Sequence, residues 1–216
     1  YLNKDTGLYA TGTQTELSVP LYWGVVPPDV RQKVSDNLAK KVVQNNFHLD
    51  VGVLGAKALL NALSENGHTE TAYRVAVQQT YPSWGWWIAN GATTLLENWD
   101  LQATRDISDN HMMFGEIGPW FYKGVGGIYP DAASPGFKHI VLKPYFAADL
   151  EQFEAKHRSP FGEICSSWTR KKAKIQYTAI VPPNCSATLY LPAPFPQKEP
   201  IKVTAGIHTW ECPLKN

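Results

Sequence analysis

Apolar residues recur every three or four positions through the first half of the chain, which is the period of an amphipathic helix. The clearest case is the segment 29–46, where an apolar residue returns every fourth position and charged side chains fill the other face. The segment 56–64 has almost no polar face, so we expect a helix that is buried nearly all round. Further helices are predicted at about 13–23, 69–79, 82–91 and 108–125. Alternating amphipathic and apolar helices indicate helical hairpins, in which one member faces water and the other a central axis.

From residue 124 onward the pattern changes to short alternating runs that Pro and Gly residues separate. Strands are predicted at 137–145, 149–157, 161–168, 175–182, 186–193 and 201–206. Turn signals roughly every ten residues are typical of a small antiparallel β-sandwich. We therefore expect an α+β, multidomain chain, with a helical domain at residues 1–128 and a sandwich domain at residues 129–216.

The balance of charges excludes several classes of partner. Because 20 Lys and Arg residues are balanced by 19 Asp and Glu residues, the formal net charge is +1. We therefore expect no general basic surface for nucleic acid or anionic lipid. The basic run at 170–174 is interpreted as a solvated strand end or hairpin turn, with an anionic partner as the alternative. No stretch approaches about 18 consecutive apolar residues, so no membrane-spanning helix is predicted.

The first residues have neither an initiator Met nor a signal-peptide pattern, so we expect a processed or excised piece. The three cysteines, Cys165, Cys185 and Cys212, are too few and too late in the chain for a disulfide framework. One bridge between two of them stays open as a possibility. Cysteine usage therefore leaves the compartment undecided.

The candidate chemistry gathers in the segment 82–111. Four of the eight tryptophans, Trp84, Trp86, Trp87 and Trp99, lie there, and their broad apolar faces suit either a protein core or the face of a sugar ring. Glu97 follows two leucines and precedes Asn and Trp, so we expect its carboxylate to lie among groups poor in solvent. Such a carboxylate either pairs with a cation or acts as an acid or base.

Histidines and short polar residues offer weaker candidates. His111 lies at a predicted helix start, capped by Ser108 or Asp109, where the helix end disfavours the imidazolium; it can bind a sugar hydroxyl, or be a capping or core residue. Asp50 can face the same cavity as Glu97, or can cap the buried helix that follows it. His48 and Asp50 are two residues apart, and paired metal-ligand motifs are absent from the sequence, so no metal site is predicted.

Several longer stretches of the sequence, taken together, resemble a known family more specifically than any single motif does. The stretches TGTQTELSVPLYWGVVP, HLDVGVLG, ALSENGHTETAYRVA, YPSWGWWIANGATTLLENWD and SDNHMMFGEIGPWFYKGVGGI follow one another in the first half. The stretches PGFKHIVLKPY and IVPPNCSATLYLP follow in the second half. Together they resemble the C-terminal part of bacterial α-L-rhamnosidases of the large inverting glycoside hydrolase family, in the right order and over nearly the whole chain.

The resemblance implies an (α/α)6 barrel followed by a C-terminal β-sandwich, with about half of the barrel present here. It implies that Glu97 is the general base and that His111 contacts the sugar or the water. The other substrate-binding residues that we expect are Trp84, Trp86, Trp87, Trp99, Asp50 and Asn110. The substrate is a rhamnose-containing oligosaccharide or glycoside, and no cofactor is expected. The family's general acid lies upstream, so a missing N-terminal part or a second chain has to cover the open barrel.

Two departures from the family's pattern leave the sugar in doubt. Leu96 stands where an aromatic residue is common, and the span from Glu97 to His111 is shorter than in many relatives. The alternatives are a non-catalytic carbohydrate-binding or structural fragment, or another (α/α)6 glycosidase. The chain is expected to be inactive on rhamnosides by itself. The bacterial periplasm, the cell surface and the cytoplasm all remain possible locations.

Overall fold

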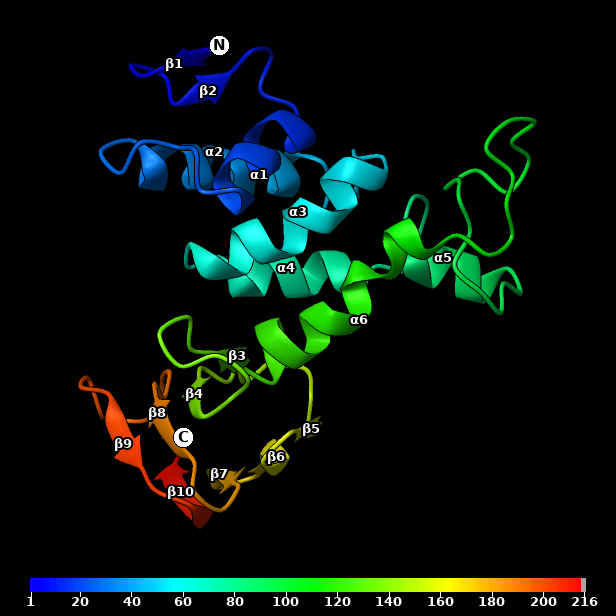
Figure 1. Cartoon of the computed structure of the whole chain (residues 1–216). Helices are drawn as coiled ribbons and strands as arrows, with labels where there is room; N and C mark the ends of the chain where they lie inside the picture. The colour runs from blue at the N-terminus through cyan, green and yellow to red at the C-terminus, as the bar shows by residue number, and fades with distance from the viewer. Residues whose placement is uncertain (215–216) are drawn as a thin grey trace. The chain divides into compact units, whose positions relative to one another are not determined.

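A computed structural model describes residues 1–214 of the chain, which divide into two compact units, Tyr1–Trp120 and Phe121–Asn216 (Figure 1). The first unit is mainly helical and the second is built from strands. No helix in the described part of the chain combines the length and the apolar character that a membrane crossing requires. The expectation of helices followed by a β-sandwich is confirmed, and each unit is described below by itself.

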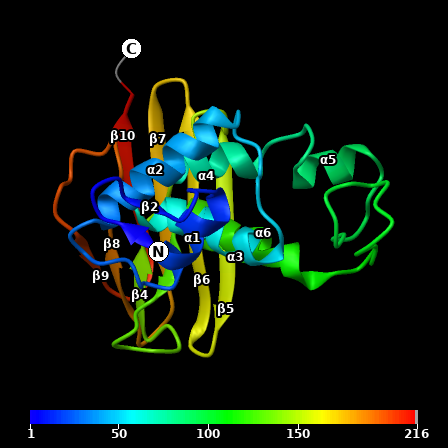
Figure 2. The same ribbon diagram turned by 90° about the horizontal axis from the view of Figure 1, so that it is seen from above.

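The helical unit is arranged around α3, Val53–Glu65, which packs against α1, α2, α4 and the 3-10 helix η1 (Figures 1 and 2). The remaining elements are a short hairpin of β1 (Leu2–Asn3) and β2 (Leu8–Tyr9), α1 (Gln14–Tyr22), α2 (Arg31–Gln44), α4 (Thr69–Ala76), α5 (Trp84–Ala89), η1 (Met112–Glu116) and α6 (Ile117–Trp120). Eight of the 13 residues of α3 are buried, which confirms a helix that is apolar nearly all round.

The connection before α3 is fixed by a buried glutamine. The side-chain amide of Gln14 donates to the carbonyl oxygen of His48 at 2.9 Å, and its oxygen accepts the backbone N–H of Asp50 at 3.0 Å. Helix α3 then begins with Gly52 at its N-cap and without a side-chain cap. The alternative reading of Asp50 as a helix cap is therefore wrong, because Asp50 lies two residues too early and its side chain is exposed.

The helix predicted at 108–125 is a sequence of three different helical forms. Residues Met112–Glu116 are 3-10 helix, Ile117–Trp120 are α-helix, and Phe121–Val125 are π-helix, which begins the second unit as η2. The sequence explains the irregularity, since Pro119 has no backbone N–H and Gly115 and Gly118 disfavour a regular helix. The cap is His111, and the prediction of Ser108 or Asp109 was wrong.

The strand unit has two four-stranded sheets, in the orders β10-β7-β6-β5 and β3-β4-β8-β9. The strands are β3 (Ile128–Pro130), β4 (His139–Leu142), β5 (Gln152–Ser159), β6 (Gly162–Lys171), β7 (Lys174–Val181), β8 (Ser186–Leu189), β9 (Ile201–Val203) and β10 (Gly206–Pro213). All pairs are antiparallel except β4 with β8, which is parallel. The six predicted strands are present, whereas β3 and β10 were missed.

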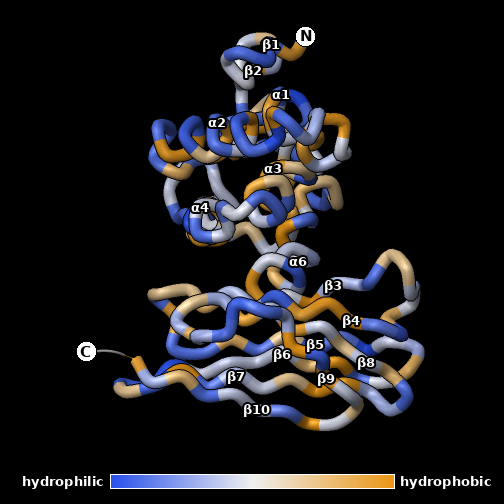
Figure 3. The backbone as a smooth tube through the Cα atoms, turned by 90° about the vertical axis from the view of Figure 1, so that its left-hand side faces the viewer, coloured by the Kyte–Doolittle hydropathy of each residue, from blue (hydrophilic) through white to orange (hydrophobic). Residues whose placement is uncertain are grey.

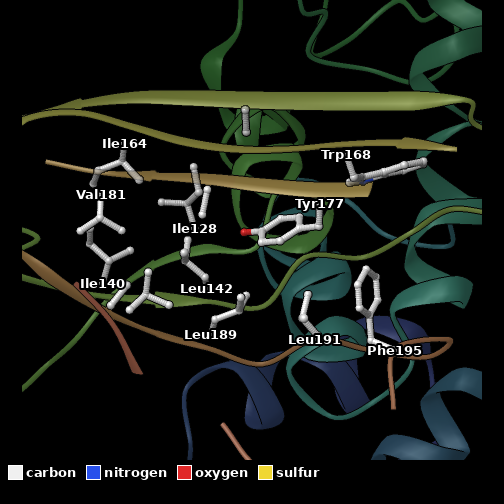
Figure 4. Close-up of a cluster of buried hydrophobic side chains, with 14 of the residues drawn as sticks. Ile128, Ile140, Leu142, Ile164, Trp168, Tyr177, Val181, Leu189, Leu191 and Phe195 are labelled. Atoms are coloured by element: carbon white, nitrogen blue, oxygen red, sulfur yellow. The ribbon is translucent and has the colours of Figure 1, made fainter. Parts of the chain in front are cut away.

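The core of the strand unit consists of side chains that both sheets supply (Figure 4). Buried and partly buried positions alternate along β7, because successive side chains of a strand point to opposite faces of its sheet. Figure 3 shows hydrophobic stretches along strands of both sheets. Tyr177 on β7 is fully buried, and burial raises the pKa of its hydroxyl far above the ordinary value, although Ser166 hydrogen-bonds to it at 3.0 Å. The sandwich thus has an ordinary two-sheet core.

Two open questions of the sequence are answered in this unit. The pairing of Lys171 with Lys174 closes the β6–β7 hairpin, so the basic run at 170–174 is a strand end and turn, as predicted. The three cysteines are all buried and unpaired, so the possible single bridge is not formed. Burial raises the pKa of the Cys165 thiol and keeps it protonated.

Candidate active site

An aromatic cluster of Trp84, Trp87, Trp99 and Phe114 forms the floor of the candidate site. Trp87 and Trp99 are stacked with ring centroids 4.3 Å apart, and Phe114 lies 4.4 Å from Trp99. Trp84 meets Trp99 edge-on at 5.3 Å. These rings come from α5, from the loop after it and from η1, so the cluster joins three segments that are distant in sequence.

Indole N–H groups fix the same segments to one another. Trp84 donates to the carbonyl oxygen of Phe114 at 3.0 Å, and Trp87 donates to that of Trp99 at 3.3 Å. Trp99 donates to the carbonyl oxygen of Val51 at 2.8 Å, just before α3 begins. These three bonds attach the cluster to backbone carbonyl groups of η1, of the loop after α5 and of the connection before α3, so the cluster holds these segments in one arrangement.

Burial divides the predicted sugar-binding tryptophans into two groups. Trp84 and Trp87 are only 5% and 2% exposed, so their faces contact other rings and not solvent. Trp99 and Trp86 are partly buried, and Trp86 meets Tyr81 edge-on at 6.1 Å.

Gly85 in the same helix lies against the carbonyl oxygen of Gln78, where a side chain would clash. This explains why a glycine interrupts the run of tryptophans.

Glu97 is held in a strand-like pairing of two loop segments. Its backbone N–H donates to the carbonyl oxygen of Ser108 at 3.0 Å, and the N–H of His111 donates to that of Leu95 at 2.8 Å. The backbone N–H of Ser108 donates in turn to Oε2 of the Glu97 side chain at 3.2 Å. The pairing closes off the loop 98–107 and places the carboxylate beside His111.

His111 and Glu97 therefore lie next to each other although 13 residues separate them in the sequence. The Nε2 atom of His111 is 3.6 Å from Oε1 of Glu97, slightly longer than a hydrogen bond, and both side chains are partly buried. The other ring nitrogen, Nδ1, accepts the backbone N–H of Met113 at 3.4 Å. The structure thus brings together Glu97, the predicted general base, and His111, which was predicted to contact the sugar or the water.

A cavity of about 390 Å³ opens beside this pair. The residues that line it are Gly52, Val53, Glu97, Asn98, Trp99, Asp106 and Phe114. A smaller hollow of about 90 Å³ lies in the following loop and shares Asn98 and Asp106 with the first. The cavity thus combines a carboxylate with an aromatic wall, and small-molecule sites are commonly lined by aromatic side chains with a few well-placed polar groups.

Asp106 and Phe114 are cavity residues that sequence reasoning did not single out. Asp106 places a second carboxylate on the wall and has a left-handed backbone with φ of 53°. Asp tolerates this conformation better than most residues, but one Asp in a polar loop carries no periodic signal. Phe114 was within a predicted helix, and only the contacts with the tryptophans distinguish it from core residues.

Two further predicted site residues, Asp50 and Asn110, line neither of the described cavities. Asp50 and Asn110 are exposed, and the backbone N–H of Asn110 donates to the hydroxyl of Ser108 at 3.3 Å. His48 contacts Thr80 at 2.7 Å, and His68 contacts Asp36 at 3.0 Å. Within residues 1–214, no three His, Cys, Asp or Glu side chains gather in a way that could hold a metal ion.

Two family models together match nearly the whole chain. Residues 1–125 match the bacterial alpha-L-rhamnosidase 6 hairpin glycosidase domain, and residues 127–205 match the bacterial alpha-L-rhamnosidase C-terminal domain. An alpha-L-rhamnosidase of Streptomyces avermitilis is 33% identical over 205 residues, which are 92% of this chain and 20% of that protein. One from Formosa agariphila is 32% identical over 189 residues, 84% of this chain and 20% of its own length.

Solved structures agree with the sequence matches. The Streptomyces avermitilis alpha-L-rhamnosidase complexed with L-rhamnose has a TM-score of 0.85 at 28% identity, covering 96% of this chain and 23% of that one. The enzyme from Aspergillus terreus has a TM-score of 0.87 at 28% identity, covering 98% and 25%. This chain spans about a fifth of the length of the curated relatives described above. The chain therefore belongs to the bacterial alpha-L-rhamnosidase family, over its six-hairpin glycosidase domain and its C-terminal domain.

Proposed function

We propose that this chain carries the water-activating side of an α-L-rhamnosidase active site, with Glu97 as the general base. The observation that supports this most is the pair of Glu97 and His111, 3.6 Å apart, beside an aromatic-walled cavity of about 390 Å³. Membership of the family supplies the substrate class. The reaction is the hydrolysis of terminal α-L-rhamnosides with inversion at the anomeric carbon.

An inverting glycosidase needs two carboxyl groups roughly 6.5 to 9.5 Å apart, with a water between the base and the sugar. Glu97 takes one proton from that water as its oxygen attacks the anomeric carbon. A second carboxyl group protonates the departing glycosidic oxygen. The family resemblance assigns this acid to residues outside the chain, which therefore contributes one half of the catalytic pair.

The aromatic residues have two proposed roles. Trp99 and Trp86 retain partly exposed faces, so they suit contact with the flat side of a sugar ring. Trp84 and Trp87 are buried, so we assign them to the support beneath the site. In sequence, Asp50 lies two residues before Gly52, which lines the cavity, and Asn110 directly precedes His111. Both side chains are exposed, and we propose that they bind hydroxyl groups of the sugar.

The open side of the helical unit needs a cover. Leu54 at the start of α3, Ile88 on α5 and Met112 on η1 are 71%, 73% and 81% exposed, all near the candidate site in sequence. Exposed apolar groups of this size are typical of surfaces that another part of a protein covers. We propose that residues outside this chain complete the barrel around them, with residues 1–128 as this chain's share.

A panel of aryl glycosides tests the proposed function with the complete protein. Aryl α-L-rhamnoside is expected to be hydrolysed at least tenfold faster than the matched aryl glycosides of other sugars. Proton NMR of the first product formed is expected to show the β-anomer, because water attacks from the side opposite the leaving group. Retention of configuration, or a preference for another sugar, would exclude this function, and a non-catalytic binding fragment would give no turnover at all.

A further inference from the structure

The position of the proton on His111 follows from the start of η1. As the N-cap residue, His111 accepts the backbone N–H of Met113 through Nδ1 at 3.4 Å. A nitrogen that accepts a hydrogen bond uses its lone pair and carries no hydrogen. The proton of the neutral ring is therefore on Nε2.

The Nε2–H edge of the ring faces Glu97. Its distance to Oε1 is 3.6 Å, and a shift of about half an ångström closes a hydrogen bond of ordinary length. Catalytic hydrogen bonds are often long in the absence of substrate and shorten when it binds. The other carboxylate oxygen, Oε2, already accepts the backbone N–H of Ser108 at 3.2 Å. Oε2 of Glu97 thus accepts one N–H, and Oε1 lies 3.6 Å from the nitrogen that would supply a second.

We propose that His111 is a positioning residue, a fixed hydrogen-bond donor to Glu97, and that the backbone N–H of Met113 sets this role by keeping the proton on Nε2. The proposal rests on the proposed function of Glu97 as the general base. The two donors, the backbone N–H of Ser108 and Nε2 of His111, both lie on the segment that pairs with residues 95–97, and together they fix the plane of the carboxylate. A carboxylate has about four lone-pair sites, so two donors leave room for a proton from water.

The proton balance of the step follows directly. Water gives one proton to Glu97, its oxygen bonds to the anomeric carbon, and the glycosidic oxygen leaves with a proton from the acid. His111 neither takes nor gives a proton, because its Nδ1 lone pair is occupied by the Met113 N–H and its Nε2 already carries hydrogen. The histidine is therefore no second base, although it lies beside the first.

Neutron diffraction from a deuterated crystal of the complete protein locates the proton directly. At neutral pH we expect deuterium on Nε2 of His111 and none on Nδ1. Deuterium on Nδ1 alone, or on both nitrogens, overturns the proposal. This result does not depend on turnover, so it is distinguishable from a failure of Glu97 as the base.

A matched pair of variants tests the donor role. The amide nitrogen of Gln reaches as far as Nε2 of His, whereas that of Asn reaches only as far as Nδ1. We therefore expect His111→Gln to keep kcat on aryl α-L-rhamnoside within about tenfold, while His111→Asn loses ten- to a hundredfold, the usual effect of one hydrogen bond to a charged group. KM should change little in either variant. Equal losses in the two variants would overturn the proposal.

Proline at two adjacent positions of η1 provides a second test that leaves His111 unchanged. The side chains of Met112 and Met113 are exposed in this chain, so neither replacement disturbs the core of its helical unit. Met113→Pro deletes the N–H that binds Nδ1, whereas Met112→Pro keeps it, and proline is tolerated in a first helical turn. With thermal unfolding as the check on folding, kcat should fall roughly tenfold or more in Met113→Pro relative to Met112→Pro. Equal kcat values contradict the role assigned to Met113.

Discussion

The two oxygens of the Glu97 carboxylate have different neighbours, and this asymmetry supports the proposed role of Glu97 as the base. Oε2 is fixed by a backbone N–H, while Oε1 faces His111. The order of residues placed Glu97 between apolar and aromatic neighbours and His111 at a helix start, and both placements hold. The contact between them was not predicted, because it depends on a pairing of loop segments that has no periodic signal.

A substitution of Trp99 tests how the aromatic cluster beneath the site contributes to stability. Trp99→Phe keeps an aromatic side chain, although a smaller one, and removes the N–H that binds the carbonyl oxygen of Val51 at 2.8 Å. We expect a loss of about 1–3 kcal/mol in the free energy of unfolding, since a partly buried carbonyl is left without its partner. Urea unfolding of the complete protein measures this. Trp86→Phe, outside the network of indole bonds described above, is the control and should change stability less.

Asp106 is the second carboxylate on the cavity wall, and its variant tests where the acid lies. Because the acid is assigned to residues outside this chain, Asp106→Asn should keep kcat on aryl α-L-rhamnoside within about tenfold of the parent value. Asp100→Asn, at a position that lines only the smaller hollow, is the matched control. A selective loss of about three orders of magnitude in Asp106→Asn would identify Asp106 as the acid and contradict the assignment.

At the scale of elements, periodicity predicted the regular helices well and their irregular neighbours poorly. Helices α1, α2 and α3 lie close to their predicted ranges, since hydrophobic spacing and turn residues act locally. The segment 112–125 mixes three helical forms, because Pro119 and two glycines change the backbone bonding where apolar spacing continues unbroken. Strand β10 was missed because its partner β7 lies about 30 residues earlier and supplies the pairing.

The start of α1 gives a test by pH. Hydrogen bonds from the backbone N–H of Thr13 and the hydroxyl of Thr11 lower the pKa of Glu16 below its ordinary 4.5. A lowered pKa stabilises the fold above the ordinary value, and this contribution is lost as the pH falls through the folded-state pKa. Urea unfolding should therefore show Glu16→Gln less stable than the parent at pH 7 and the difference shrinking below pH 4.5. A constant difference would contradict this, and exposed Glu163→Gln serves as the control.

At the scale of the whole molecule, the change from helical to alternating patterns predicted both units. The hydrophobic pattern could not predict two features. One is the parallel pairing of β4 with β8, which joins strands that are far apart in the sequence. The other is that the three thiols are free, since the spacing of cysteines along the chain does not determine which of them form disulfides. The sequence predicted a site in the aromatic segment, but which rings are buried depends on tertiary contacts. Because Trp84 and Trp87 are buried, we propose a supporting role for them and not a contact with the sugar.

The chain by itself provides a test of completeness. It spans about a fifth of its curated relatives, and Leu54, Ile88 and Met112 near the candidate site are exposed. We expect residues 1–216 alone to give no turnover of aryl α-L-rhamnoside above background, with circular dichroism as the check on folding. Measurable turnover by the isolated chain would show that it contains both carboxyl groups of the pair.

Replacement of Glu97 tests the central claim most directly. In the complete protein, Glu97→Gln removes the proton acceptor and keeps the shape of the side chain. We expect kcat on aryl α-L-rhamnoside to fall by roughly three orders of magnitude or more, with KM little changed, because a base acts mainly in the transition state. Glu199→Gln, at an exposed loop position, should behave as the parent. Undiminished turnover in Glu97→Gln would contradict the account.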